Sequence, residues 1–393
     1  MDRSRPVTVL TLLAALLLAL TLAPGVAGAK ISKTGDQKIL LGAKLYFDAG
    51  LSEPSGQACA DCHQPFAGYA DPAQDLPVSQ GVIPGRFGGR NAPSAAYMPW
   101  SPVLHQDTDG VWTGGAFWDG RASGWTDGKP LIEQAKGPFL NPGEMNNADK
   151  SEVVRDVRES TYAGLFKVVY GKAAFDDVDK AYHSVADAIA AFESSSKVNT
   201  FSSRFDAYAT AGDAFALSEQ EKLGLELYDG TALCSQCHPS TPGGYSTGPA
   251  AGKALFTDYT YDNLGIPYNP AFAEPPLDFA FVPDVGLGGF LRVAGYDEDV
   301  AAAADGAFKV PTLRNVGKTA PYGHNGYFAT LQDIVHFYNT RDVLSAAWPA
   351  PEVPQNVNTD ELGDLGLTPD EEAAIVAFLS TLDDQTEFDP SGL

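Results

Sequence analysis

The pattern Cys-x-x-Cys-His occurs twice in this chain and uses all four of its cysteines. The first copy is Cys59, Cys62 and His63, and the second copy is Cys234, Cys237 and His238. Two cysteines at this spacing can form thioethers with the two vinyl groups of one porphyrin, and the adjacent histidine then reaches the iron from one side of the ring. The pattern therefore predicts two covalently bound c-type haems.

Paired cysteines also have other uses. Four cysteines in an exported protein can form two disulfides. A Cys-x-x-Cys pair can also be half of a zinc site or a redox-active dithiol. Two complete copies, with a histidine in each and no cysteine left over, favour haem attachment over these alternatives.

The ligand on the opposite side of each iron decides what that haem can do. Methionine is the usual partner in electron-transfer cytochromes. Apart from Met1, the chain contains only Met98 and Met145, and both lie in its first half. Unless the halves exchange ligands, the second iron is bound by another side chain. The remaining candidates for it are His324, His336 and Tyr338.

Residues 330–339 have the spacing of a helix with one apolar face. This face is formed by Leu331, Ile334, Val335 and Tyr338. We expect it to face the haem, and His336 lies well round the helix from it. The geometry favours Tyr338 as the ligand, although a buried tyrosine with a hydrogen-bonded hydroxyl is the ordinary alternative. A tyrosinate is a hard anionic donor that stabilises oxidised iron and lowers its potential.

Similar segments begin and end the two halves of the chain. Residues 41–46 and 223–228 precede the two haem motifs, and both have apolar residues at helical spacing. Residues 188–192 and 374–378 are a second similar pair, one at the end of each half. The chain therefore uses one plan twice, with a helix, a haem motif, a long connection and a closing helix.

The connections are rich in glycine and proline and run over about residues 81–143 and 239–320. Loops of this length are usually functional, and a haem can organise them because it supplies apolar surface. We predict a mainly α fold with few strands, made of two cytochrome c-like haem domains with long ordered loops. The predicted domains are residues 30–212 and 213–393. A capping box predicts that the last helix begins at Thr368.

The N-terminus has the features of a targeting segment. Arg3 and Arg5 precede an apolar run over residues 7–23, and small residues follow at 27–29. This pattern predicts a signal peptide, residues 1–29, that is cleaved on export to the periplasm, where c-type haem is attached. An uncleaved anchor is the alternative, but the run is short for a spanning helix, and we predict no stable membrane insertion.

The formal net charge of −24 makes the chain strongly acidic. Such a charge argues against nucleic acid or an anionic membrane surface as a partner. It would suit the attraction of a basic electron-transfer protein, and it would equally serve solubility.

Four further segments carry a resemblance to a known family. They are Phe-Trp-Asp-Gly-Arg-Ala at 117–122, the segment from Gln134 to Met145, Val-Pro-Thr-Leu-Arg-Asn at 310–315 and Pro-Tyr-Gly-His-Asn-Gly at 321–326. With two haem motifs in this order, the chain resembles the bacterial di-haem cytochrome c peroxidase family, and within it the MauG-like branch, over nearly all of its mature length. The resemblance implies a haem peroxidase in which the first haem is peroxidatic and the second transfers electrons.

The resemblance also implies roles for single residues. Trp118 matches the tryptophan that passes electrons between the haems, and Gln134 with Glu144 matches the polar pair above the first haem. Tyr338 stands fourteen residues after His324, at the position that binds the second iron in the family, where MauG also has tyrosine. The implied iron ligands are His63, His238 and Tyr338.

A calcium ion between the two halves is implied as well. Asn91, Thr319 and the carbonyl group of Pro321 match the family's calcium site, and water would complete the oxygen shell. The predicted cofactors are therefore two c-type haems and one calcium ion.

The chain departs from the family pattern in two places. Residues 81–90 contain no histidine, although the cytochrome c peroxidases of the family have one there that caps the first iron. The first haem is therefore expected to be open in the ferric state, with His105 as the alternative cap. Residues 123–130, which include Trp125, form an insertion that could shape a partner surface.

The predicted reaction is the reduction of hydrogen peroxide. Peroxide would be activated at the first haem, and Trp118 would pass oxidising equivalents to the second haem, bound by Tyr338. Electrons would come from a small donor protein, a cytochrome c or a cupredoxin. Two alternatives stay open, the peroxide-driven oxidation of a residue in a partner protein, as in MauG, and plain electron transfer without peroxide chemistry.

Overall fold

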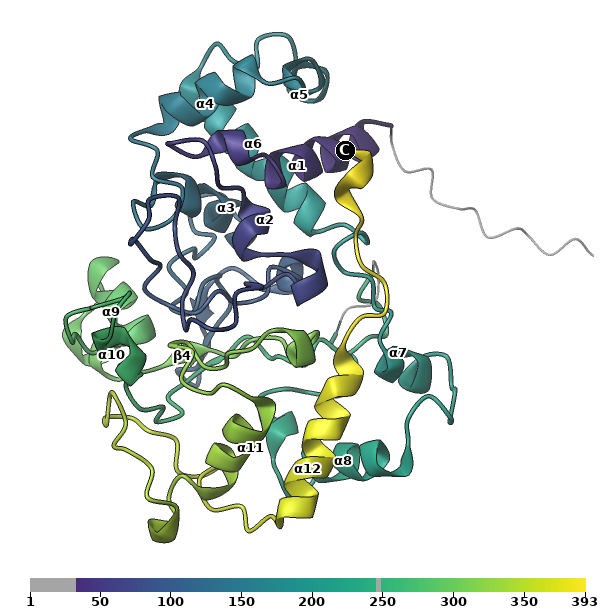
Figure 1. The fold of residues 1–393 in the computed structure, drawn as a ribbon, viewed down its shortest axis with the longest axis vertical. Helices are drawn as coiled ribbons and strands as arrows, with labels where there is room; N and C mark the ends of the chain where they lie inside the picture. The colour runs from purple at the N-terminus through teal and green to yellow at the C-terminus, as the bar shows by residue number, and fades with distance from the viewer. Residues whose placement is uncertain (1–32, 245–248) are drawn as a thin grey trace, which may run out of the picture.

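The structure is a computed structural model and describes residues 33–244 and 249–393 (Figure 1). The predicted signal peptide, residues 1–29, lies outside the described residues. The fold is mainly helical, as predicted. The helices are α1 (Lys33–Tyr46), α2 (Cys59–Cys62), α3 (Pro130–Leu140), α4 (Lys150–Glu159), α5 (Ala163–Tyr170), α6 (Val178–Glu193), α7 (Arg204–Ala209), α8 (Glu219–Asp229), α9 (Gly286–Val293), α10 (Glu298–Ala302), α11 (Leu331–Thr340) and α12 (Pro369–Leu379). None of these helices combines the length and the apolarity needed to cross a membrane.

Strands are few and short. The two antiparallel pairs are β1 (His105–Gln106) with β2 (Trp112–Thr113) and β3 (Tyr261–Asp262) with β4 (Phe308–Lys309). In the second pair, Lys309 lies opposite Tyr261. These ladders tie loops together, so the helices determine the architecture.

Each half of the chain is built on a pair of packed helices, α1 with α6 and α8 with α12 (Figure 1). A glycine lies at each crossing. A Cβ atom on Gly42 would lie 1.9 Å from the carbonyl oxygen of Ala188, and one on Gly224 would lie 2.0 Å from that of Ala374. Both distances are far inside van der Waals contact, so only glycine lets these backbones approach so closely. The two pairs of similar segments in the sequence are therefore two equivalent helix crossings.

Side-chain caps fix where two of the important helices begin. The capping box predicted at Thr368 is present, with reciprocal hydrogen bonds between Thr368 and Glu371 at the start of α12. Thr330 and Asp333 form the same arrangement at the start of α11. Each box satisfies N–H groups that the first helical turn leaves unpaired, which is worth about 1 kcal/mol.

Several contacts join the two halves. From α12 the C-terminal segment runs back to lie beside α1 (Figure 1). There Phe388 packs against Phe47 and Phe192, at ring-centroid distances of 5.8 and 5.2 Å. Arg90 of the first half donates two hydrogen bonds, of 2.6 and 2.7 Å, to the Asp284 carboxylate of the second half.

The stretches predicted to be irregular contain three helices, and the prediction was wrong there. Residues 81–143 include α3, and residues 239–320 include α9 and α10. α3 starts with Pro130 in its first turn and also contains Pro138. Proline is tolerated in a first turn but is a poor helix residue further along, so composition concealed this helix.

Candidate functional site

Both Cys-x-x-Cys-His motifs open into one cavity of about 610 Å³ between the two halves of the chain. The residues predicted to take part in haem binding and catalysis all line it, namely Cys59, Cys62, His63, Trp118, Gln134, Glu144, Cys234, Cys237, His238 and Tyr338. The predicted calcium ligands Asn91, Thr319 and Pro321 line it too. The fold therefore gathers residues from most of the chain around one space.

The two motif histidines are held in the same way. The Nδ1 atom of His63 lies 3.1 Å from the carbonyl oxygen of Tyr69, and that of His238 lies 2.9 Å from the carbonyl oxygen of Phe256. A carbonyl oxygen can only accept, so Nδ1 carries the proton and Nε2 keeps its lone pair, as an iron ligand requires. Burial lowers the pKa of both histidines, which also favours the neutral ring.

Four aromatic residues position these histidines, and sequence reasoning missed the role of all four. Tyr69 and Phe256 have positive φ angles of 62° and 53°, an unusual conformation for bulky residues, and present their carbonyl groups to the imidazoles. The hydroxyl groups of Tyr46 and Tyr228 donate to the backbone carbonyls of the two motif histidines. The one signal in the sequence was the parallel place of Tyr46 and Tyr228 ahead of the motifs.

The cysteine geometry disagrees with the other uses of paired cysteines. No disulfide joins any two of the four cysteines. Burial raises the pKa of Cys62, Cys234 and Cys237 to about 12, whereas redox-active dithiols need a lowered pKa. Among the described residues, the one group of cysteine, histidine and carboxylate side chains close enough to hold a metal contains a single cysteine, which is not a typical structural zinc set.

Unsatisfied polar groups gather at the cavity wall. Among the described residues, six buried side-chain atoms have no hydrogen-bond partner, and four of these belong to the wall residues Gln57, Ser79, Glu193 and His324. Such groups are rare in folded proteins because each costs about 1–3 kcal/mol. Their concentration here fits a space that holds a large group with polar edges. The wall therefore fits the haems that the two motifs predict.

Gln134 and Glu144 line the cavity in the first half, Gln134 from α3 and Glu144 from the loop that follows it. The Asn141 side chain donates a 2.6 Å hydrogen bond to Oε1 of Glu144. Burial raises the pKa of Glu144, and this hydrogen bond and the charge of Arg121 only partly oppose the rise. A carboxyl group in this state is suited to proton exchange closer to neutral pH.

Helix α11 turns its predicted apolar face to the cavity. Leu331, Ile334, Val335 and Tyr338 all line the wall. His336 on the same helix is exposed and lies 2.9 Å from the Glu372 carboxylate. No described residue hydrogen-bonds to the Tyr338 hydroxyl. Burial raises the pKa of Tyr338, so the phenol keeps its proton unless a cation replaces it.

The other two histidines considered as iron ligands are placed differently. His324 is buried on the cavity wall, but its ring stacks on Phe308, with centroids 3.6 Å apart and planes at 11°. His105 is exposed on β1 and does not line the cavity. Its Nδ1 lies 2.9 Å from the carbonyl oxygen of Val103. The structure therefore does not bring His105 to the first haem motif.

Trp118 is tied to both halves of the chain. Its Nε1 donates a 2.9 Å hydrogen bond to the carbonyl oxygen of Asn91. Its own carbonyl oxygen accepts a 2.8 Å hydrogen bond from the backbone N–H of Lys309 in the second half. Asn91 in turn donates its backbone N–H to the carbonyl oxygen of His324, at 2.8 Å. These bonds fix the backbone and the indole of Trp118 at the seam between the halves.

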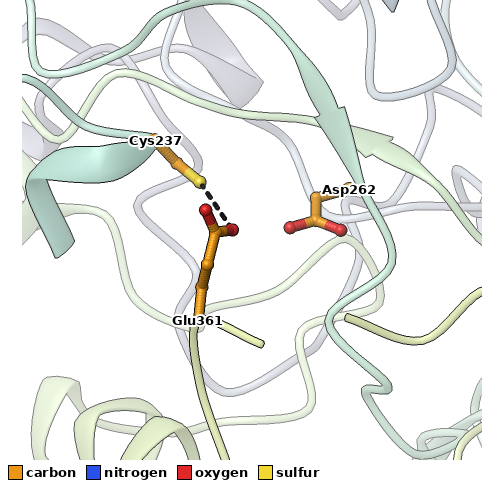
Figure 2. A group of neighbouring side chains, drawn as sticks. All are labelled: Cys237, Asp262 and Glu361. Atoms are coloured by element: carbon orange, nitrogen blue, oxygen red, sulfur yellow. Dashed lines mark hydrogen bonds between the residues drawn. The ribbon is translucent and has the colours of Figure 1, made fainter. Parts of the chain in front are cut away.

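A group of carboxylates beside the second motif was not predicted. Cys237, Asp262 and Glu361 bring their Sγ and carboxylate atoms within 4.8 Å of one another (Figure 2). The Glu361 carboxylate points toward the Cys237 sulfur, 3.9 Å away, and Asn358 donates hydrogen bonds of 2.6 and 2.7 Å to Asp262 and Glu361. Because Cys237 belongs to a haem motif, we interpret this group as an acidic edge of the cavity rather than as a metal site.

The predicted calcium ligands offer neutral oxygens only. Asn91 is buried, and its side-chain amide donates to the carbonyl oxygen of Pro77 at 3.1 Å, which leaves Oδ1 without a donor among the described residues. Carbonyl oxygens of Thr319 and Pro321 with water would be an acceptable set for calcium.

The insertion at residues 123–130 connects the two halves on the surface. Trp125 packs against Phe290 and Tyr296 of the second half, at centroid distances of 5.6 and 6.1 Å. Its Nε1 donates to the carbonyl oxygen of Leu104, at 2.7 Å. The insertion therefore has a structural role in addition to any partner contact.

Known proteins are similar to this chain in sequence and in fold. The family model of the di-haem cytochrome c peroxidases matches residues 36–214. The chain is 34% identical to the methylamine utilization protein MauG of Paracoccus denitrificans over 380 residues, which covers 93% of both chains. It is 32% identical to the cytochrome c551 peroxidase of Nitrosomonas europaea, covering 88% of this chain and 80% of that one.

A solved structure is similar over the same range. The crystal structure of the diheme peroxidase BthA from Burkholderia thailandensis superimposes with a TM-score of 0.77 at 32% sequence identity, covering 89% of this chain and 87% of that one. The similarity extends through both halves, and the relatives named above are haem oxidoreductases. This chain is therefore an enzyme that belongs to the di-haem cytochrome c peroxidase family, in its MauG-like branch.

Proposed function

We propose that this protein is a periplasmic peroxidase that reduces hydrogen peroxide at the haem of the first motif, with electrons from a cytochrome c or a cupredoxin. Reduction of one peroxide to two waters consumes two electrons and two protons. The observation that carries the proposal is the inequality of the two halves of the cavity. Gln134 and Glu144 line the first half, whereas Tyr338 lines the second.

We assign one haem to each of two domains, residues 30–212 and 213–393. The buried side chains support this division, because one core spans residues 41–201 with three residues from 250–259, and the other spans residues 205–382. Phe205 on α7 packs in the second core, a few residues ahead of the proposed boundary.

The bound haem irons supply the redox chemistry, and the chain supplies proton transfer and orientation. Glu144 takes a proton from one peroxide oxygen and returns it to the other, as general acid–base catalysis requires. The hydrogen bond from Asn141 to Oε1 fixes the carboxyl group and leaves Oε2 without a described donor. The Gln134 amide can both donate and accept, so it can hold the peroxide in one orientation.

The second haem is proposed to be held by His238 and Tyr338, with Trp118 passing electrons between the halves. A phenolate oxygen is a hard anionic donor that favours oxidised iron. A calcium ion at Asn91, Thr319 and Pro321 would hold Trp118 in place, because the Asn91 carbonyl accepts from the indole.

Tyr338 also supports a second candidate function, the peroxide-driven oxidation of a residue in a partner protein. A ligand that favours oxidised iron suits an enzyme that retains oxidising equivalents until a protein substrate docks. The identity to MauG over most of the chain points the same way. Plain electron transfer is the weakest candidate, since it leaves Gln134 and Glu144 without a task.

The test is to add stoichiometric hydrogen peroxide to the di-haem protein in its all-ferric state. We expect the absorption spectrum to change without prior reduction, and reduced cytochrome c added next to be oxidised rapidly. A peroxide-induced state that persists in the presence of reduced cytochrome c would favour the partner-protein function instead. A ferric protein that ignores peroxide would contradict both.

A further inference from the structure

Lys309 is a buried cation with no ion-pair partner among the described residues. Its side chain is on β4 and is 5% exposed. The Nζ atom lies 3.5 Å from the carbonyl oxygen of Val310 and 5.5 Å from the centre of the Tyr259 ring. No carboxylate of the described residues lies within the 4.0 Å that defines an ion pair. An ammonium group in this position costs several kcal/mol unless an anion meets it.

The position of Lys309 shows where that anion must lie. The residue lines the haem cavity, and its backbone N–H holds the carbonyl group of Trp118 at 2.8 Å. Its side chain lies over the ring of Tyr259, and the backbone N–H of the preceding residue, Asp258, donates a 3.1 Å hydrogen bond to the carbonyl oxygen of Cys237, so the ammonium group lies beside the second motif. Burial also lowers the pKa of Lys309 itself, to about 8, and the charge of Asp258, which lies beyond ion-pair distance, only partly opposes this lowering.

A c-type haem brings carboxylates into this cavity. Attachment through both vinyl groups leaves the two propionate groups of the porphyrin free. A carboxylate on a covalently attached group reaches a buried cation without the entropy loss that a free anion would suffer on binding. No carboxylate of the described residues pairs directly with Lys309, so the cofactor is the natural source of one.

We propose that the ammonium group of Lys309 is the counter-ion of a propionate of the haem attached at Cys234 and Cys237. Lys309 then acts as a positioning residue. Its backbone holds Trp118 and its side chain holds the edge of the second haem, so one residue sets the distance between them. The same charge raises the potential of this haem, since a nearby cation favours the less positive, reduced state.

The test uses Lys309→Met, which keeps the length of the side chain and removes its charge, and Lys309→Arg, which keeps the charge. The matched control is Lys253→Met. Lys253 also lies over an aromatic ring, 5.1 Å from the centre of Phe201, but it does not line the cavity. Each protein is first shown to contain two haems per chain by its reduced absorption spectrum.

The protein is produced in cells supplied with aminolevulinate that carries ¹³C at its carboxyl carbon, which labels the haem propionates. The first measurement is the infrared difference spectrum between its oxidised and reduced states. We expect a labelled carboxylate band to shift in Lys309→Met, and to stay near its native place in Lys309→Arg and Lys253→Met. We also expect the midpoint potential of the second haem to fall in Lys309→Met, with little change in the control.

Two results would overturn the proposal. One is a set of labelled bands that is the same in Lys309→Met and the native protein. The other is a midpoint potential of the second haem that changes with the concentration of added acetate or chloride while the labelled bands of the native protein do not shift. The counter-ion of Lys309 would then come from solvent. Neither measurement uses peroxide, so a failure here is distinguishable from a failure of the proposed peroxidase activity.

Discussion

Glu144 combines the two properties that a proton-transfer group in a peroxidase needs. It is held in place by Asn141, and burial raises its pKa. It shares the cavity wall with Gln134, whose amide could orient a peroxide. At the scale of single residues, the proposed chemistry of the first haem depends on this carboxyl group.

Glu144→Gln should slow the reaction of the ferric protein with peroxide by about 100-fold or more, because the amide keeps the size of the side chain but cannot exchange a proton. Stopped-flow absorption at neutral pH measures this rate. Glu53→Gln is the control, since Glu53 is exposed, lies beside Met145 through a backbone hydrogen bond, and does not line the cavity. Equal rates in the two variants would remove Glu144 from the mechanism.

Glu193 gives a second prediction at this scale. It is 4% exposed on the cavity wall, Oε2 has no partner, and burial raises its pKa from the ordinary 4.5 to about 8. The folded protein therefore keeps a proton that the unfolded chain loses. Its stabilising effect is complete below about pH 4.5 and is lost as the pH rises through about 8.

The free energy of unfolding of the native protein should therefore fall between pH 5 and pH 7 relative to that of Glu193→Gln, by about 3 kcal/mol at most. Chemical denaturation at a series of pH values measures both proteins. Parallel pH profiles would show that Glu193 is ionised in the folded state. The comparison uses the pH dependence of the free energy of unfolding, so any pH-independent cost of burying the glutamine amide in Glu193→Gln cancels.

At the scale of elements, the two glycine crossings determine how each half of the chain is built. Gly42→Ala and Gly224→Ala should each destabilise the protein by about 2 kcal/mol or more, because the new methyl group would overlap the backbone of α6 or α12. Gly164→Ala in α5 is the control, since its Cβ would meet no atom within 4 Å. That change should be neutral or stabilise by up to about 1 kcal/mol. Thermal unfolding measures all three, and equal effects would contradict the close crossings.

Many of the helices and their ends could be predicted from the sequence, because the signals for them are local. The apolar face of α11 and the capping box of α12 are patterns within ten residues, and both are present. α3 was missed because Pro130 and Pro138 conceal its periodicity. Gln134 on that helix was nevertheless identified as a site residue, because the family motif could be matched without predicting the helix.

The site was predictable where one short motif contains it and not where distant segments meet. The place of the haem motifs and of Tyr338 on the cavity wall follows from spacing, and the role of Tyr338 as a ligand stays a prediction. The carbonyl groups of Tyr69 and Phe256 could not be foreseen, because their role depends on backbone conformation rather than on residue type. The short distance between the Asp262 and Glu361 carboxylates, and the burial of Lys309 away from any ion-pair partner among the described residues, likewise arise only from tertiary contacts.

At the scale of the whole molecule, one ion-pair network joins the halves next to Trp118. Arg90 binds Asp284 of the second half and also lies 2.6 Å from Asp119, the neighbour of Trp118. Burial alone would raise the pKa of Asp284, but the hydrogen bonds and charge of Arg90 bring it below its ordinary value. This contribution to stability is present above the unfolded pKa and is lost as the pH falls through the folded one.

Arg90→Met should lower the free energy of unfolding at pH 7 by about 2 kcal/mol or more, since it leaves the partly buried Asp284 carboxylate without its cation and Asp119 with Arg121 alone. The control is Arg155→Met, because Arg155 pairs with Asp156 on the surface and its side chain is 49% exposed. That change should leave the free energy of unfolding nearly unchanged, because solvent screens this pair. Denaturant titration compares the two, and a loss in Arg90→Met no larger than in the control would contradict a stabilising link between the halves.

The whole arrangement amounts to two similar halves of the chain made unequal by a few side chains. The helix crossings, the histidine supports and the tyrosines ahead of each motif are the same in both halves. Gln134 and Glu144 occur in the first half and Tyr338 in the second. We infer that this inequality, rather than the presence of two haems, makes the protein a peroxide-activating enzyme.

The most direct test of the inequality is the electron paramagnetic resonance spectrum of the all-ferric protein, compared with that of Tyr338→Met. We predict one high-spin signal, from the open haem of the first motif, and one low-spin signal, from the haem held by His238 and Tyr338. Tyr338→Met should move the low-spin signal and leave the high-spin signal unchanged. Two low-spin signals in the native protein, or a high-spin signal that changes with Tyr338, would contradict the assignment of an open first haem and a closed second haem.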